Sequence, residues 1–161
     1  MQSSADFVTF SLEDSLYAVT VHRVQEILDV RPIARMPGTP PHLLGVIDLR
    51  GATVPVVDMR VLLGLPPRQD DPQTRILVVH LEATEAADAV IGLRTDRVID
   101  VACLDEDSAQ PLSEGQRRAW DAVSIHSVGR RNGQVVGIID LDGLFRDVPR
   151  GSITPSHDAA A

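Results

Sequence analysis

The stretch GVIDLRGATVPVVDMR, residues 45–60, determines how the rest of this chain is interpreted. Two runs rich in valine and isoleucine flank Arg50 and Gly51, a pattern typical of a β-hairpin with a tight turn. Asp58 follows the second run, where its carboxylate can accept the unpaired N–H groups at the start of a helix. The stretch therefore predicts a hairpin followed by a short, capped helix.

The same unit occurs a second time near the end of the chain. With Gly51 placed on Gly133, the segments RGATVPVVDMRVLL and NGQVVGIIDLDGLF align without a gap, at an offset of 82 residues. Asp140 then falls on Asp58, so a turn glycine and a helix cap are expected in both copies. The sequence thus predicts two copies of one fold.

A second match extends the repeat. RVQEI, residues 23–27, aligns with RVIDV, residues 97–101, at an offset of 74, so that Val24, Glu26 and Ile27 fall on Val98, Asp100 and Val101. Because this offset is smaller than the one at the hairpin, the second copy must contain extra loop. The polar segment 105–120 is the expected place for it.

The remaining apolar runs predict further elements. Strands are expected at residues 7–12, 16–19, 76–81 and 90–93, with another beginning at Val30. By contrast, Val21, Val24 and Ile27 recur at helical spacing, which predicts a short amphipathic helix or turn over residues 21–28. The Pro-rich and charged segment 66–73 is expected to be a connector.

Composition narrows the class of protein. Aromatic residues make up only 3% of the 161 residues, so the core must consist of valine, leucine and isoleucine, which suits small β-barrels. The net charge of -8 argues against a nucleic-acid partner, which requires a basic surface. Without a signal peptide or an apolar run of about 20 residues, a cytoplasmic protein is expected, with no insertion into a membrane. The lone Cys103 is expected to be a small buried residue, and the tail 148–161 to be disordered.

Catalytic chemistry finds no support in the sequence. The five histidines are scattered without the spacing of a zinc site, and no nucleophile elbow, P-loop or dinucleotide-binding motif is present. The acidic run from Asp105 to Asp107 lacks the spaced ligands and the glycine of a calcium loop. We therefore expect no enzyme activity, no cofactor and no metal.

Together these motifs resemble the CheW family of bacterial chemotaxis coupling proteins. The resemblance spans residues 6–147 and rests on segments that occur in the family's order: YAVTVHRVQEIL, RMPGTP, GVIDLRG, VPVVDMR, GLRTDRVIDV and GRRNGQVVGIIDLDGLF. It implies a single, mainly β domain in which two five-stranded SH3-like barrels, at about 6–66 and 74–147, pack against each other with short helices.

The resemblance also implies a function. Members of the family are non-catalytic adaptors that join the cytoplasmic tip of a chemoreceptor (methyl-accepting) to the regulatory domain of a CheA-type histidine kinase in signalling arrays. It implies a receptor-binding groove between the barrels, with walls from the repeated V-x-x-(Ile/Val) element and charged residues at its rim. The residues that it assigns to this groove are Val24, Glu26, Arg50, Val98 and Val101.

Each of these residues also has a plain structural interpretation. The three valines could be ordinary core residues, Glu26 could lie on the solvated face of a short helix, and Arg50 could be a turn residue that favours solubility. Two other functions remain open: an adaptor for a dedicated non-flagellar pathway such as pili, or a module that binds a small molecule or phosphoprotein in the groove.

Four positions depart from the family's usual pattern. Asp48 stands where the family usually has Asn, and Ser127 replaces a frequent Gly. Arg94 and Thr95 occupy positions that are commonly apolar, so their strand is expected to be an exposed edge. These changes are expected to affect the choice of partner rather than the fold.

Overall fold

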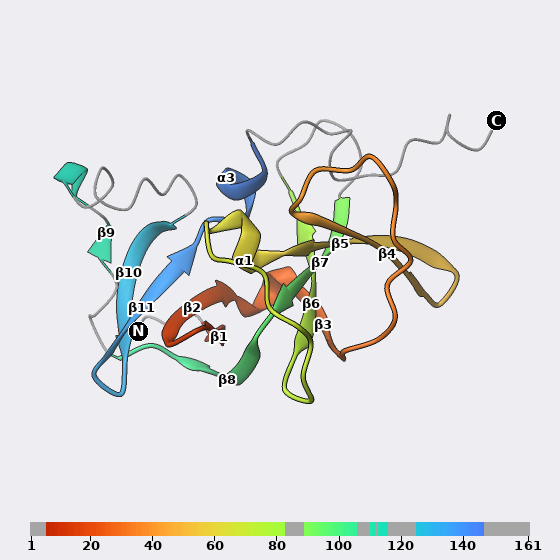
Figure 1. Cartoon of the computed structure of the whole chain (residues 1–161). Coiled ribbons are helices and arrows are strands. Elements are labelled where there is room, and N and C mark those ends of the chain that lie inside the picture. Colours follow the sequence, from red (N-terminus) through yellow and green to blue (C-terminus); the bar gives the residue numbers. More distant parts are fainter. Residues whose placement is uncertain (1–5, 83–88, 106–109, 112, 116–124, 147–161) are drawn as a thin grey trace.

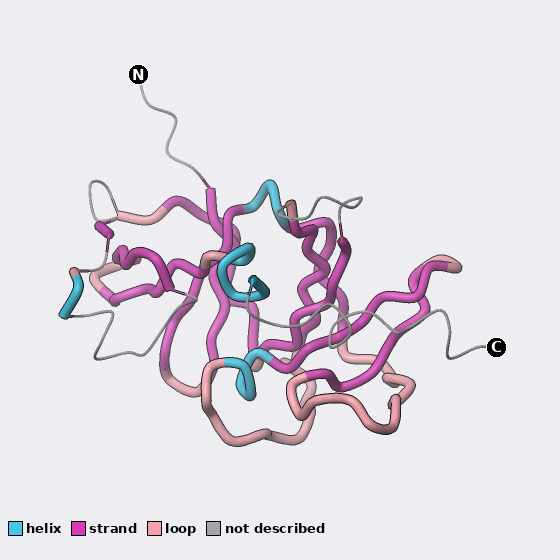
Figure 2. The backbone as a smooth tube through the Cα atoms, turned by 90° about the horizontal axis from the view of Figure 1, so that it is seen from above, coloured by secondary structure: helices cyan, strands magenta, loops and turns pink. Residues whose placement is uncertain are grey.

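The computed structural model describes residues 6–82, 89–105, 110–111, 113–115 and 125–146. Strands make up most of the described backbone (Figure 2). In chain order the strands are β1 (Asp6–Leu12), β2 (Ser15–Thr20), β3 (Val24–Asp29), β4 (Leu43–Leu49), β5 (Ala52–Asp58), β6 (Arg75–Leu81), β7 (Ala89–Thr95), β8 (Arg97–Cys103), β9 (Gln110–Pro111), β10 (Ile125–Arg131) and β11 (Gln134–Ile139). The helices are the 3-10 turn η1 (Val21–Arg23), α1 (Met59–Leu62) and α3 (Leu141–Arg146).

These strands form two sheets. The first sheet has the order β8-β1-β2-β11-β10-β9, and the second has the order β3-β6-β7-β5-β4. In Figure 1, β9 to β11 lie at one side of the molecule and β4 with β5 at the other, while β1, β2, β6 and β7 lie between them. The expected mainly β fold of two small packed barrels with short helices is confirmed.

Each sheet takes strands from both halves of the sequence. The first sheet joins β1 and β2 to β8, β10 and β11, while the second joins β3, β4 and β5 to β6 and β7. The connector between the sequence copies therefore does not separate the two sheets. The strand orders correspond when β1, β2, β3, β4 and β5 are replaced by β6, β7, β8, β10 and β11.

The repeat extends to the parallel strand pairs. In the second sheet β5 pairs with β7 and places Val56 opposite Gly92. In the first sheet β11 pairs with β2 and places Ile138 opposite Ala18. Ile138 is the repeat partner of Val56, and Gly92 that of Ala18. The two copies thus exchange strands symmetrically.

Irregularities in the ladders are also repeated. β3 carries an extra residue, Gln25, against β6, and β8 carries Ile99 at the corresponding position against β1. β4 has an extra residue at position 44 against β5, and β10 has one at position 126 against β11. Such single-residue bulges bend a strand and change which side chains share a face.

One of these bulges explains an error in the expected secondary structure. The predicted helix or turn over residues 21–28 is right only for residues 21–23, which form the 3-10 turn η1. The rest of the segment belongs to strand β3. The extra residue Gln25 places Val24 and Ile27 on the same face of the strand, opposite Val79 and Leu77. Apolar residues three apart on one face imitate the spacing of a helix.

The strand expected from Val30 is also wrong. Between β3 and β4 the described chain forms only an isolated bridge, from Ala34 to Val46. The expected strands 7–12, 16–19, 76–81 and 90–93 correspond to β1, β2, β6 and β7. Parts of the predicted extra loop at 105–120 and the whole predicted tail at 148–161 lie outside the described residues.

Two apolar clusters form the hydrophobic core. The central core lies between the sheets and combines Val8 and Phe10 of β1 with Leu77 of β6, Leu93 of β7 and Phe145 of α3. A smaller cluster fills the second sheet's own interior, around Val54, Val56, Ile76 and Val78. Aliphatic side chains dominate both, as the composition predicted.

Two further expectations are corrected by burial. The side chains of Arg94 and Thr95 are buried, with 3% and 0% exposure, because β7 lies in the middle of the second sheet rather than at its edge. Cys103 is exposed at the end of β8, an edge strand, instead of buried, and its Sγ lies 2.9 Å from Oδ1 of Asp6.

Candidate protein-interaction surface

The turn between β4 and β5 carries the first of two similar rims. Arg50 and Gly51 both have left-handed backbones, with φ of 52° and 86°, the geometry of a tight hairpin turn. Asp48 closes the turn, because its Oδ1 accepts a hydrogen bond from the Gly51 N–H at 3.0 Å. This geometry presents the Arg50 side chain outside the sheet.

Arg50 forms a two-pronged ion pair with Glu26 of β3. Its Nη1 donates to Glu26 Oε1 at 3.3 Å, and its Nη2 contacts Oε2. The hydrogen bond between the two side chains lowers the pKa of Glu26 and raises that of Arg50. Because β3 and β4 are the two outer strands of the second sheet, this pair joins its open edges. We call Val24, Glu26, Ile27 and Arg50 the first rim.

The first sheet has an equivalent second rim. Asp100 of β8 contacts Nη2 of Arg131, at the end of β10. The following turn residues, Asn132 and Gly133, have φ of 51° and 80°. Both their N–H groups donate to the carboxylate of Asp105, at 2.9 and 3.0 Å. These backbone hydrogen bonds lower the pKa of Asp105. We call Val98, Asp100, Val101 and Arg131 the second rim.

Each rim carries an apolar pair. Val24 and Val98 are half-buried and pack against the same central core. Ile27 and Val101 follow these valines by three residues along β3 and β8, and 40% and 52% of their surfaces are exposed. In the described part of the chain, the only other large apolar side chain of comparable exposure is Val135 of β11. Glu26 and Asp100 alternate with these aliphatic residues along the edge strands, so each rim combines an exposed aliphatic side chain with a neighbouring ion pair.

The structure brings some of the expected site residues together. Glu26 and Arg50 are in direct contact, and Val24 and Val98 border one core from the two sheets. Val101 lies at the exposed end of the second rim. The expected caps also lie at helix starts, where Asp58 Oδ1 accepts the Arg60 N–H at 3.0 Å and Asp140 Oδ1 accepts the Gly143 N–H at 3.1 Å.

Sequence reasoning missed Ile27, Asp100 and Arg131. The repeat offset of 74 residues pointed to the first two, because it pairs Ile27 with Val101 and Asp100 with Glu26. Arg131 had no such signal. The repeat aligns Arg50 with Asn132, so the second arginine comes from the neighbouring position and only the folded chain shows that the ion pair recurs.

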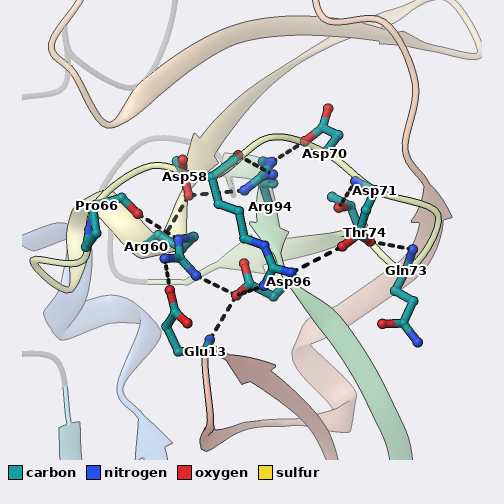
Figure 3. Close-up of polar contacts among 11 residues, drawn as sticks. Glu13, Asp58, Arg60, Pro66, Asp70, Asp71, Gln73, Thr74, Arg94 and Asp96 are labelled. Carbon is teal, nitrogen blue, oxygen red and sulfur yellow. Dashed lines mark hydrogen bonds and ion pairs between the residues drawn. The ribbon is translucent and has the colours of Figure 1, made fainter.

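A buried ionic network surrounds Arg60 and Arg94 (Figure 3). Arg60 of α1, with a side chain 2% exposed, donates to Asp96 Oδ2 at 2.6 Å and to the Pro66 carbonyl at 2.7 Å, and it contacts Glu13. Burial opposes the charge, but the ion pairs raise the pKa of Arg60 overall. The network joins the β1–β2 turn, the connector and the β7–β8 turn.

A second buried arginine, Arg94, holds the connector. Its Nε donates to Asp70 Oδ1 at 2.5 Å, its Nη2 donates to the Arg68 carbonyl at 2.8 Å, and its Nη1 lies 3.7 Å from Asp58 Oδ1. Both arginines are occupied by groups of the protein itself. The network therefore serves the fold, and it leaves the rims as the candidate surface.

Other kinds of site find little support in the described residues. Within the described ranges, no three His, Cys, Asp or Glu side chains come close enough to share a metal ion. None of the helices in the same part of the chain has the length and apolar character of a membrane span.

Comparison with known proteins agrees with this architecture. The family model for the CheW-like domain matches residues 6–148. The chain is 28% identical over 157 residues to the chemotaxis protein CheW of Bacillus subtilis, covering 98% of this chain and 97% of the relative. It is 30% identical over 149 residues to a probable chemotaxis protein CheW of Rhizobium etli, covering 91% and 90% of the two chains.

A solved structure is also similar. The scaffolding protein TtCheW of Thermoanaerobacter tengcongensis superposes with a TM-score of 0.76 at 27% identity, covering 91% of this chain and 95% of that one. The match to nearly the whole chain confirms the resemblance found in the sequence. The chain belongs to the CheW-like domain family.

Proposed function

We propose that this protein is a non-catalytic chemotaxis scaffold that couples the cytoplasmic tip of a chemoreceptor to the regulatory domain of a CheA-type histidine kinase. The observation that carries the proposal is the pair of rims, each an exposed aliphatic residue beside a fixed ion pair on an edge strand. Membership of the CheW-like domain family supports the same role.

The rims suit a helical partner. An amphipathic helix buries apolar side chains spaced along one face, and Val24, Ile27, Val98 and Val101 offer aliphatic contacts for them. The flanking ion pairs, Glu26 with Arg50 and Asp100 with Arg131, are held by the fold and can fix the orientation of the helix through charge. The protein then acts by placing receptor and kinase on one scaffold, without chemistry of its own.

Surface variants test the receptor contact. Val101→Asp and Ile27→Asp each place a charge where an apolar side chain is exposed, so they should weaken binding of a receptor cytoplasmic fragment by about tenfold or more. Val135→Asp is the matched control, because Val135 is equally exposed but lies on β11, outside both rims. Binding is measured by calorimetry, and circular dichroism checks that all three variants remain folded.

The coupling itself requires the kinase. The purified protein is mixed with the receptor fragment and the kinase, the assemblies are sedimented, and kinase activity is measured. We expect the protein to bring the kinase into the pellet and to change its activity. If neither sedimentation nor activity depends on the protein, the proposed function is wrong.

A charge exchange tests the ion pair of the first rim. Arg50→Glu should weaken receptor binding, because it places two carboxylates side by side at the rim. The double variant Glu26→Arg/Arg50→Glu restores an attractive pair in reversed orientation. If the double variant recovers stability but not binding, the direction of the charges is recognised by the partner. If wild type, the single variant and the double variant all bind the receptor fragment equally, the ion pair is not part of the receptor-binding surface.

A further inference from the structure

The β4–β5 and β10–β11 turns are each closed by a carboxylate, but the two carboxylates accept different numbers of backbone hydrogen bonds. Asp105 accepts two backbone hydrogen bonds, one on each oxygen, from Asn132 and Gly133. Asp48 accepts one, on Oδ1, from Gly51 at 3.0 Å. In the described part of the chain, Asp48 has no further hydrogen bond and no ion pair.

The turn at Asp48 does not need a negative charge. A single N–H donor can be accepted equally by the side-chain carbonyl of an asparagine, which has the same shape as an aspartate and favours the same turns. Asp105 differs, because an asparagine there would offer only one acceptor oxygen to two N–H groups. The fold therefore requires the hydrogen-bond acceptor of Asp48 but not its negative charge.

No cation in the described structure forms an ion pair with this carboxylate. Arg50, two residues along the turn, directs both of its terminal nitrogens to Glu26. Asp48 itself is exposed between the buried Ile47 and Leu49, so its side chain points to the outer face of β4. The charges of Glu26 and Arg50 cancel. Arg31 also lies close enough to Glu26 to lower the pKa of that carboxyl, but it forms no ion pair with Asp48 in the described structure, so the Asp48 carboxylate is the exposed charge without a partner at this end of the first rim.

We propose that Asp48 determines partner specificity at the first rim, by selecting a receptor helix that carries a Lys or Arg where it passes the β4–β5 turn. The proposal rests on the proposed function, because it names the chemistry of the partner at the same surface. A basic side chain gains an unpaired carboxylate there, whereas an acidic one meets uncompensated repulsion.

The test compares wild-type protein with Asp48→Asn in binding a receptor cytoplasmic fragment from the same organism. The variant keeps the acceptor for Gly51 and should keep the thermal midpoint, yet bind about two- to fivefold more weakly at low salt, the range of an exposed ion pair. The difference should vanish in high salt, where the charges are screened. Asp14→Asn, in the exposed β1–β2 turn, changes the net charge equally and should bind as wild type.

A second arm identifies the basic partner group. Each Lys or Arg of the fragment's tip is replaced by Ala, and for one of these fragments wild type and Asp48→Asn should bind equally. If the affinities of wild type and Asp48→Asn become equal for that fragment, the replaced basic group interacts directly with Asp48.

The outcomes separate the two proposals. If wild type binds the fragment but Asp48→Asn binds equally at low salt, Asp48 has no role in specificity while the proposed function stands. If Asp48→Asn unfolds at a lower temperature, its charge is used by the fold and the inference is overturned. If wild type binds no receptor fragment, both proposals fail together.

Discussion

Arg60 illustrates how far the fold depends on single buried charges. Its guanidinium is almost fully enclosed and lies between Asp96 and Glu13, two residues far apart in the sequence from each other and from Arg60. A buried charge that loses its partner is costly, because the remaining group can neither reach water nor find another ion. The contact thus links the two halves of the chain at one point.

Replacing Arg60 should therefore destabilise the protein strongly. Arg60→Leu leaves the Asp96 carboxylate, 7% exposed, without its closest counter-ion, and we expect a loss of about 3 to 5 kcal/mol of unfolding free energy. Arg50→Leu is the matched control, since the Arg50 side chain is 68% exposed and an ion pair in water contributes little to stability. Urea denaturation measures both. Similar losses would contradict the assignment of Arg60 to a buried network.

His42 should make stability depend on pH. Burial lowers the pKa of its imidazole, and its Nε2 has no hydrogen-bond partner in the described structure. As the pH falls through about 6.5, the unfolded chain takes up a proton that the folded chain resists, so the contribution of His42 to stability is present above that pH and lost below it. Denaturation of wild type and His42→Gln between pH 7.5 and 5.5 measures the effect, and the variant should show the smaller loss. Equal losses would show that His42 titrates normally.

At the scale of elements, the repeated bulges bend the strands of both sheets at equivalent positions. Each copy has one bulge on its edge strand and one on the first strand of its hairpin. The edge-strand bulges place Val24 with Ile27, and Val98 with Val101, on one face. The apolar part of each rim is therefore a product of the bulge as much as of the side chains.

The hairpin bulge in the second sheet depends on Gly45. Its φ is 149°, and a Cβ atom there would lie 2.2 Å from the Ala34 carbonyl oxygen, which pairs with the adjacent Val46. We expect Gly45→Ala to cost about 3 kcal/mol, because the backbone of residue 34 must move. Gly38→Ala tests strain alone, since Gly38 also has positive φ but open space around it, and it should cost about 1 kcal/mol. Thermal unfolding compares them; equal effects would mean that residue 34 adjusts freely.

The second copy tolerates a serine at the same position. Ser127 is the repeat partner of Gly45, and it is not among the described residues of positive φ. β9, the counterpart of the bridge at Ala34, pairs there instead with Ser127 and Val128. The departure from glycine noted in the sequence thus fits the local backbone.

For the whole molecule, the exchange of strands predicts cooperative unfolding. Every pairing between β3 and β6, β5 and β7, β1 and β8, or β2 and β11 joins the two halves of the chain. The central core also takes side chains from both sheets. Neither sheet can open fully without breaking contacts that the other requires.

A mutation in one sheet should therefore weaken the other equally. Val56→Ala removes methyl groups from the interior of the second sheet and should cost about 2 kcal/mol. Hydrogen exchange should then show the same loss of protection in β1 and β2 of the first sheet as in β6 and β7. A loss confined to the second sheet would show that the sheets unfold independently.

The sequence by itself determined the features that depend on neighbouring residues. The turns at Arg50 and Gly51 and at Asn132 and Gly133, the aspartates at the helix starts and the repeat all follow from short patterns, because turn chemistry and capping act within a few residues. The order of the motifs along the chain was also sufficient to identify the family, and the family implied the mainly β fold.

Only the tertiary structure decided how these pieces combine. The sequence predicted one barrel from each half of the chain, but each sheet pairs strands from both halves, because pairing between distant strands does not follow from local patterns. It predicted a helix or turn over residues 21–28 because a bulge imitates helical spacing. It expected exposed Arg94 and buried Cys103 because the position of a strand within a sheet does not follow from local sequence. The ion pairs of the rims likewise appear only when hairpin turns and edge strands meet, since those contacts join residues that the chain keeps 24 or more positions apart.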